Sequence, residues 1–307
     1  MSAFLNAVPG AVAQGMIWGI MAIGVFITYK VLEFSDLTVD GSMCTGAAVC
    51  VMMMVNGYGV AVSMAAAVAA GMLAGLVTGI FHTFMGIPGI LAGILTQLSL
   101  YTVNLKIMGK ANQALSVRNY DLLVSMNYLK NVSVFENTIF VVAVFVVILI
   151  AVLYWFFGTE MGCGIRATGC NQNMSRAQGI NTKAYTVMGL VISTGIVALA
   201  GALLCQYQGF ADVQMSRGAI VIGLAAVIIG EVVFGKFFRN FGLKLLAVSF
   251  GAIIYYMVIQ VVLWLGLNTN DLKMLTALVV AMFLAVPHWK GKLAARRAGK
   301  KGDAAHA

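Results

Sequence analysis

Residues 137–157 read NTIFVVAVFVVILIAVLYWFF, a run of 21 residues without one charged side chain. A helix of about 20 apolar residues is long enough to cross the hydrocarbon core of a bilayer. A polar stretch follows at residues 158–183, GTEMGCGIRATGCNQNMSRAQGINTK, and a second long apolar segment begins at residue 184. This alternation predicts helices that cross a membrane, joined by a loop that lies in water.

The composition of the whole chain also indicates a membrane protein. Of 307 residues, 61% are hydrophobic and 9% are charged, whereas about a quarter of the residues in soluble domains are charged. The net charge of +9 is no sign of a nucleic-acid partner, because six of the 19 basic residues lie in the last 18 positions and the others flank apolar segments. Basic residues placed in this way set the orientation of a protein among membrane lipids.

The predicted fold class is an all-α polytopic membrane protein with eight or nine transmembrane helices. Helices are expected because an unpaired backbone cannot cross lipid and no barrel-type alternation is present. The alternative with eight helices has one piece, residues 38–56 or 273–288, that re-enters the membrane without crossing it. The nine segments are residues 9–30, 38–56, 58–82, 88–108, 137–157, 184–205, 218–234, 245–266 and 273–288.

The distribution of basic residues assigns the two faces of the membrane. If the basic tail at residues 289–307 is cytoplasmic, an odd number of crossings places the N-terminus outside. The cytoplasmic side then holds 13 basic residues, including those of the 158–183 loop, and the outer side holds six. An excess of basic residues on the cytoplasmic side is the rule for membrane proteins, so we expect this orientation.

A short pattern occurs twice along the chain. Residues 34–39, FSDLTV, and residues 210–215, FADVQM, share a Phe-x-Asp start, and each is followed by two glycines. Five predicted crossings separate the copies, so they approach the membrane from opposite faces. This predicts an inverted-topology repeat, a design common in transporters, although chance similarity between two segments rich in glycine and alanine is the alternative.

Two motifs together resemble a known family. The Asp36–Gly41 stretch, DLTVDG, and the loop from Arg166 to Asn181 are similar to those of permease subunits of bacterial ATP-binding-cassette (ABC) importers. The branch is that of the branched-chain amino acid and ribose permeases, and the nearest members are encoded beside tryptophan- or tyrosine-type binding proteins. The likeness covers nearly the whole chain as a single domain, residues 1–307. The loop at residues 109–136 departs from it, being longer and more polar.

The resemblance implies a set of partners and a location. They are a cytoplasmic ABC ATPase, an external substrate-binding protein, a second permease copy that completes a dimer, and the lipid of a bacterial plasma membrane. In the family, the loop at residues 158–183 holds a coupling helix that docks on the ATPase. The residues expected to take part are Arg166, Gly169, Asn171, Arg176, Ala177 and Gly179.

The chain itself has no recognisable site for a nucleotide or a metal. Residues 230–237 satisfy the GxxxxGK pattern, but Phe237 replaces the Ser or Thr that must contact Mg²⁺. The five cysteines form no CxxC pair and no cluster with histidine, which predicts neither a metal site nor a disulfide framework. We therefore expect this chain to be no enzyme and to hold no cofactor, with ATP and Mg²⁺ bound by the ATPase.

Polar side chains at helical spacing are candidates for a translocation path. A polar group in the bilayer centre is unfavourable unless it faces protein or water. The candidates form one stripe on the fourth segment and one on the eighth, and the alternative is that they are interhelical hydrogen-bond partners or interface anchors. They are Gln97, Tyr101, Asn104, Tyr256 and Gln260.

Carboxylates and glycines stand where helices are expected to begin. A carboxylate there can accept free backbone N–H groups and interact with the positive end of the helix dipole; contact with a substrate ammonium group is the alternative. These residues are Asp36, Asp40, Gly41, Asp212 and Gly218. Glu231 is expected to pair with Lys236. The small residues that recur every fourth position from Ser63 to Gly79 predict close helix packing, either within the chain or across a dimer.

Three functions compete. The first is an ABC importer permease for an amino acid, aromatic by resemblance, and the second is the same machine for a sugar or a nucleoside. The third is a secondary transporter that acts alone, which would need ionisable residues deep in the helices for ion coupling. No Asp, Glu, Lys or Arg stands near the middle of a predicted helix, which favours the first two.

Overall fold

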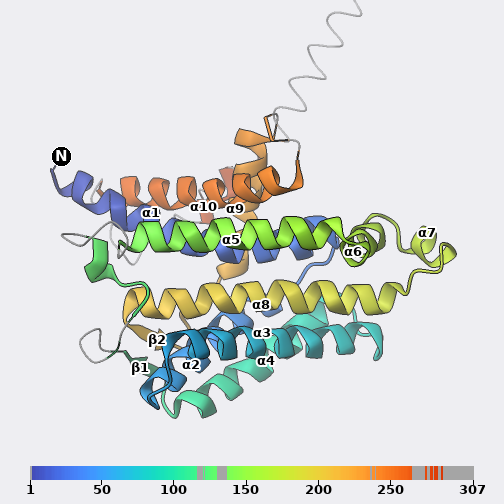
Figure 1. The fold of residues 1–307 in the computed structure, drawn as a ribbon, viewed down its shortest axis with the longest axis horizontal. Coiled ribbons are helices and arrows are strands. Elements are labelled where there is room, and N and C mark those ends of the chain that lie inside the picture. The colour runs from blue at the N-terminus through green and yellow to red at the C-terminus, as the bar shows by residue number, and fades with distance from the viewer. Residues whose placement is uncertain are drawn as a thin grey trace, which may run out of the picture.

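The computed structural model describes residues 2–115, 120, 122–129, 137–235, 237–238, 240–264 and seven positions between 274 and 285. Within this part of the chain the fold is a helical bundle with one small two-stranded ribbon (Figure 1). The α-helices are α1 (Ser2–Phe26), α2 (Thr38–Val55), α3 (Val60–Thr83), α4 (Gly89–Met108), α5 (Thr138–Gly158), α6 (Glu160–Cys170), α7 (Gln172–Ala177), α8 (Thr182–Gln208), α9 (Ala219–Phe234) and α10 (Phe241–Trp264). The shorter elements are the π-helix η1 (Ile27–Val31), the 3₁₀-helix η2 (Met126–Leu129) and the strands β1 (Asn112–Ala114) and β2 (Phe210–Asp212).

The structure confirms an all-α polytopic membrane protein. In the described residues seven helices are long and apolar enough to span a bilayer, namely α1 with η1, α2, α3, α4, α5, α8 and α10. Residues 218–234 were expected to form a full crossing, but α9 has only 16 residues. The expected segment at 273–288 lies largely outside the described residues.

The bundle has two distinct ends, and the long helices run between them (Figure 1). The N-terminus and the β1–β2 ribbon lie at one end, called here the ribbon end. Helices α6 and α7 lie at the other, called here the α6 end. The ribbon is antiparallel, with Gln113 opposite Ala211, and it places part of the 109–136 loop against the segment after α8. No strand was expected from the sequence in that loop.

Helices α1 and α8 are antiparallel neighbours near the centre of the molecule. The Ser193 hydroxyl of α8 donates to the Gly24 carbonyl of α1 at 2.8 Å, and the Tyr207 hydroxyl donates to the Gly10 carbonyl at 3.2 Å. Helices α2, α3 and α4 lie on one side of α8, and α5, α9 and α10 lie on the side of α1 (Figure 1).

The first half of the repeat begins with α1, α2 and α3, and the second half consists of α8, α9 and α10. The two halves are related as an inverted repeat. In the first half α3 packs on α8, because Gly71 lies against Ala198 and Gly79 against Val187. In the second half α10 packs on α1, because Gly15 lies against Ile253. The third helix of each half, α3 or α10, therefore packs on the first helix of the other half, α8 or α1. The two first helices, α1 and α8, run in opposite directions.

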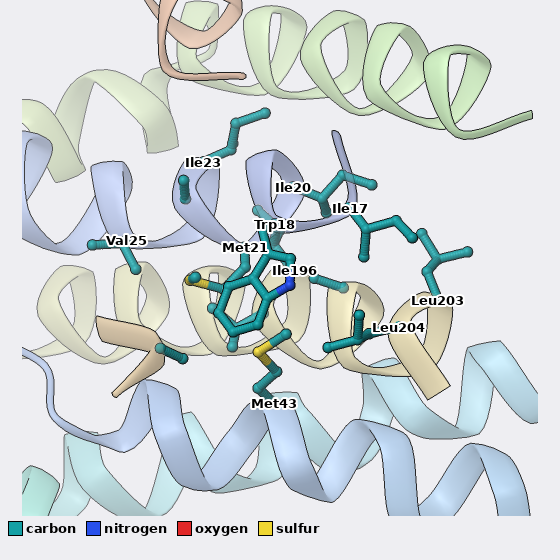
Figure 2. Close-up of a cluster of buried hydrophobic side chains, with 14 of the residues drawn as sticks. Ile17, Trp18, Ile20, Met21, Ile23, Val25, Met43, Ile196, Leu203 and Leu204 are labelled. Carbon is teal, nitrogen blue, oxygen red and sulfur yellow. The ribbon is translucent and has the colours of Figure 1, made fainter. Parts of the chain in front are cut away.

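A cluster of large apolar side chains fills the space between α1, α2 and α8 (Figure 2). Trp18 of α1 lies at its centre with Met21 and Met43 beside the indole. The Trp18 ring also contacts Tyr256 of α10, with centroids 5.8 Å apart. Large side chains thus fill the interior, while glycines allow the backbones around it to approach closely.

Candidate functional site

The starts of α2 and α9 meet inside the bundle. Asp40, in the first turn of α2, accepts the backbone N–H of Gly218 at 2.9 Å and that of Ile220 at 3.0 Å. The Ser216 hydroxyl donates to the Asp40 carbonyl. One carboxylate from the first half therefore caps a helix of the second half, where free N–H groups and the helix dipole favour a negative charge.

This junction lies between the two ends of α8, and Asp40 and Gly218 are half-buried there. Gly46, further along α2, packs against Ala198 of α8, and Gly201 packs against Met43. Because α2 runs alongside α8 in the same direction, Asp40 lies about 9 Å closer to the α6 end than Gly46 does. Helix α9 accordingly begins within the bundle and runs to the α6 end, which explains its short length.

The two copies of the sequence repeat form the same local turn. Asp36 accepts the N–H of Thr38 at 2.8 Å, and Asp212 accepts the N–H of Gln214 at 2.7 Å. In both cases an aspartate oxygen bonds the backbone two residues on, which is an Asx turn. Asp36 stands two positions before the first residue of α2, whereas Asp212 ends strand β2 and stands seven positions before the first residue of α9.

The Asp36 carboxyl is buried, and one of its oxygens, Oδ2, has no hydrogen-bond partner among the described residues. Burial raises the pKa of Asp36 above its ordinary value of 3.8, while the hydrogen bonds from Thr38 act in the opposite direction. Its neighbour Thr38 joins Thr78 of α3 at 2.8 Å, and Thr78 donates to Thr96 of α4 at 2.9 Å. This chain of hydroxyls ties the start of α2 to two neighbouring helices.

The candidate path residues of α4 face in different directions. Gly41 of α2 packs against the backbone of Gln97, so this part of α4 lies on α2. Asn104 is buried beside Cys44, and its Oδ1 has no partner in the described part of the chain. Tyr101 is 42% exposed on the outer face. Of the three candidates, Asn104 is therefore buried, Gln97 is half-buried and Tyr101 is exposed.

The candidate stripe on α10 lies on the other side of the bundle. Tyr256 is buried against Trp18 and Tyr255, and Gln260 is half-buried one turn further on. Helix α10 packs on α1 and α9, whereas α4 packs on α2 and α3. The structure therefore does not bring the two stripes together within this chain.

Helix α6 is packed against the bundle. The Arg166 guanidinium lies over the ring of Phe241 at 4.3 Å and over that of Phe157 at 5.4 Å. Gly169 touches η1 so closely that a Cβ there would lie 1.9 Å from the Val31 carbonyl oxygen. Two residues expected from the sequence to couple to an ATPase thus contact this chain's own helices.

Helix α7 is the exposed tip of the α6 end (Figure 1). It begins at Asn171, whose side chain accepts the N–H of Met174 at 3.0 Å. Arg176 donates to Thr182 at 2.9 Å and so fastens α7 to the start of α8. Ala177, the last residue of α7, and Gly179 are both exposed. The positive φ of Gly179, 81°, turns the chain toward α8.

One ion pair was missed by sequence reasoning. Glu231 of α9 pairs with Lys30 of η1 at 3.0 Å; the partner expected from the sequence, Lys236, lies outside the described residues. The two partners are 201 positions apart, so no spacing rule connects them. Only the packing of α9 beside α1 could have indicated this pair.

These features define a class of protein: a helical membrane permease with inverted halves and short helices that begin within the bundle, the arrangement of transporters. The chain belongs to the family described as branched-chain amino acid transport system / permease component, which matches residues 9–287. The resemblance drawn from the Asp36–Gly41 stretch and the 158–183 loop is thereby confirmed.

Three relatives illustrate the breadth of this similarity. The chain is 38% identical to the tyrosine transport system permease protein of Clostridioides difficile (strain R20291) over 92% of this chain and 91% of the relative. It is 30% identical to an uncharacterised protein of Rickettsia prowazekii (strain Madrid E) over 92% of this chain and 98% of that protein. The fructose import permease protein FruF of Bifidobacterium longum (strain NCC 2705) is 28% identical over 80% of this chain and 67% of its own length.

Proposed function

We propose that this chain is the membrane permease of an ABC importer that moves an amino acid with an aromatic side chain. A separate binding protein delivers the solute, and a separate ATPase, which binds ATP and Mg²⁺, drives the cycle. The observation that carries the proposal is the 38% identity to a tyrosine transport permease across nearly the full length of both chains. In the membrane the chain pairs with a second copy.

The contact with the ATPase is assigned to α7 and its flanks. Nearly all residues of this tip are exposed, and Met174 at its centre is 64% exposed. An apolar side chain held in water on a projecting helix is suited to a groove on a partner protein. Asn171, Arg176, Ala177 and Gly179 shape and fasten this tip, as described above.

Movement of the tip reaches the centre of the bundle through close contacts. Gly169 joins α6 to η1, and Arg166 joins α6 to Phe241 of α10. Helices α1 and α10 both pack on α9, whose first turn is held by Asp40 of α2. Displacement of α6 therefore shifts α9 against α2, the rigid-body motion that alternating access requires.

The orientation follows from the basic residues and the position of the tip. The α6 end faces the cytosol, where the ATPase is, and it holds Arg166, Arg176 and Lys183. The N-terminus and the β1–β2 ribbon then face outward, toward the binding protein. The C-terminal tail is cytoplasmic.

The coupling role of α6 is tested by a pair of glycine substitutions. Gly169→Leu forces α6 away from η1, whereas Gly158→Leu changes a residue of the same loop with no atom within 4 Å of the new Cβ. In vesicles that hold permease, ATPase and binding protein, we expect Gly169→Leu to reduce solute-stimulated ATP hydrolysis at least tenfold with normal membrane insertion. Equal ATPase rates in the two variants would show that this contact carries no coupling.

The solute is tested by ligand binding to the proposed partner binding protein. We expect tyrosine, phenylalanine or tryptophan to bind and to stimulate ATP hydrolysis by the complete complex. A sugar is the second candidate, because a fructose import permease is among the relatives. Uptake by the purified chain without any ATPase would instead make it a secondary transporter.

A further inference from the structure

Two adjoining cavities open at the α6 end, between α1, α6, α9 and α10. The larger has a volume of about 480 Å³, and Lys30, Arg166, Glu231 and Lys244 contribute to its wall. The smaller, about 150 Å³, lies between α9 and α10. Phe26, Glu231 and Lys244 line both cavities, so the two share part of their wall.

The two cavities differ in chemistry. The larger carries three cationic side chains and one carboxylate, a net charge of +2. The smaller shares Glu231 and Lys244 with the larger, and the rest of its lining is apolar and includes Val227, Phe238 and Val248. A basic cavity that adjoins a mainly apolar one fits an amphipathic ligand with an anionic head.

Two of the cations have no anionic partner in the described part of the chain. Glu231 is already paired with Lys30 at 3.0 Å. The side chains of Arg166 and Lys244 make neither a hydrogen bond nor an ion pair to the described residues, and the Arg166 Nε is buried without an acceptor. A buried donor without an acceptor is unfavourable, and two cationic side chains without an anionic partner are suited to bind an anion.

The position of Arg166 leaves its donors free for such an anion. Its guanidinium lies over the rings of Phe241 and Phe157. Stacking uses the face of the guanidinium, whereas its five N–H groups lie in its plane. The rings thus hold the cation in place, and the N–H edge can bind two oxygens of a phosphate at once.

We propose that this double cavity binds an anionic phospholipid. Its phosphate lies between Arg166 and Lys244, and the first part of one acyl chain enters the apolar cavity beside Val227 and Val248. Basic pockets between transmembrane helices recognise acidic lipid headgroups in this way. A free phosphate ion would satisfy the two cations but would leave the apolar cavity unfilled.

The test uses the full-length chain, purified in detergent and stripped of lipid. Dioctanoyl phosphatidylglycerol is titrated while binding is followed by native mass spectrometry and by the thermal transition. Phosphatidylcholine with the same chains, glycerol 3-phosphate and inorganic phosphate are titrated in parallel. We expect phosphatidylglycerol alone to bind and to raise the transition temperature.

A matched pair of variants tests the location. Lys244→Gln removes an exposed cation from the cavity, and Lys183→Gln removes one from the exposed first turn of α8, at the same end but outside the cavity. We expect Lys244→Gln to weaken phosphatidylglycerol binding about fivefold, as for loss of one basic residue near a headgroup. Lys183→Gln leaves the affinity unchanged.

The other outcomes would overturn the proposal. Equal losses in the two variants would mean nonspecific attraction to a basic surface. Equally tight binding of inorganic phosphate or glycerol 3-phosphate would mean a site for a free anion, and equally tight binding of phosphatidylcholine would mean a purely apolar site. Both substituted lysines are exposed, so the variants are expected to fold.

Discussion

At the scale of single residues, Asp40 holds the two halves of the protein together. Its side chain starts from α2, but both of its oxygens accept N–H groups at the start of α9. The covalent connection between these helices runs through six intervening α-helices, α3 to α8, and both strands of the ribbon. A single carboxylate therefore fixes where α9 begins relative to α2.

The role of Asp40 is tested against an ordinary helix cap. Asn137 caps α5 through the N–H of Ile139 at 3.0 Å, within its own helix. Asp40→Ala and Asn137→Ala are each expected to lower the free energy of unfolding by about 1 kcal/mol. Only Asp40→Ala should reduce transport, because only this change removes hydrogen bonds between the two halves. Thermal unfolding in detergent and uptake into vesicles measure the two effects, and equal uptake would contradict the role.

Asp36 makes the stability of the folded protein depend on pH, in a direction that its pKa defines. Burial raises its pKa in the folded state above the ordinary 3.8, so between these two values the folded protein binds more protons than the unfolded chain. Its contribution to stability is then largest at low pH and is lost as the pH rises through the folded pKa. We expect Asp36→Asn to match the wild type near pH 4 and to melt at a higher temperature at pH 7, in thermal scans at several pH values. A difference independent of pH would contradict this.

At the scale of elements, glycines decide which helices touch. Gly71, Gly75 and Gly79 of α3 all face α8, which places the stripe predicted from the sequence in an internal contact. A Cβ at Gly75 would lie 2.1 Å from the Thr194 hydroxyl and 2.7 Å from the Leu190 carbonyl oxygen. The helices approach this closely only because no side chain intervenes.

The α3–α8 contact is tested by comparing two glycines of the same region. Gly75→Leu inserts a side chain into this contact, whereas Gly59→Leu changes the residue before α3, where nothing lies within 4 Å. Overpacking costs about 1–3 kcal/mol, so Gly75→Leu should lower the thermal transition and the yield of monodisperse protein on gel filtration. Gly59→Leu should behave as the wild type. Indistinguishable profiles would mean that α3 and α8 are not in close contact.

At the scale of the whole molecule, the two ends of the bundle differ in structure. The α6 end holds the exposed tip and the basic cavity, and the ribbon end holds the N-terminus and the β1–β2 pairing (Figure 1). Asp40 and the start of α9 lie between these ends. A force applied at the tip therefore acts on the junction through α6, α1 and α10.

The orientation is testable with the natural cysteines. Cys163 and Cys170, both on α6, are exposed, whereas Cys44, Cys50 and Cys205 are buried. A membrane-impermeant maleimide should label inside-out vesicles and leave right-side-out vesicles unlabelled. The double variant Cys163→Ser/Cys170→Ser should abolish the labelling. Labelling from the outer face would reverse the orientation and remove the docking role of α7.

The sequence by itself determined the class of protein and its plan. Apolar runs of about 20 residues located the seven spans, because burying such a run in lipid needs no knowledge of its neighbours. The repeated Phe-x-Asp pattern indicated two inverted halves, and the structure shows the same Asx turn at Asp36 and Asp212. The family resemblance also rested on short stretches of sequence, the Asp36–Gly41 stretch and the loop from Arg166 to Asn181.

Only the tertiary structure decided which distant residues meet. Asp40 and Gly218 are 178 positions apart, and Glu231 pairs with Lys30 across 201. Arg166 was expected at a partner's surface, yet it packs against Phe241 of this chain. Spacing along the sequence fixes the face of a helix on which a residue lies, but which other helix covers that face depends on how the whole bundle packs.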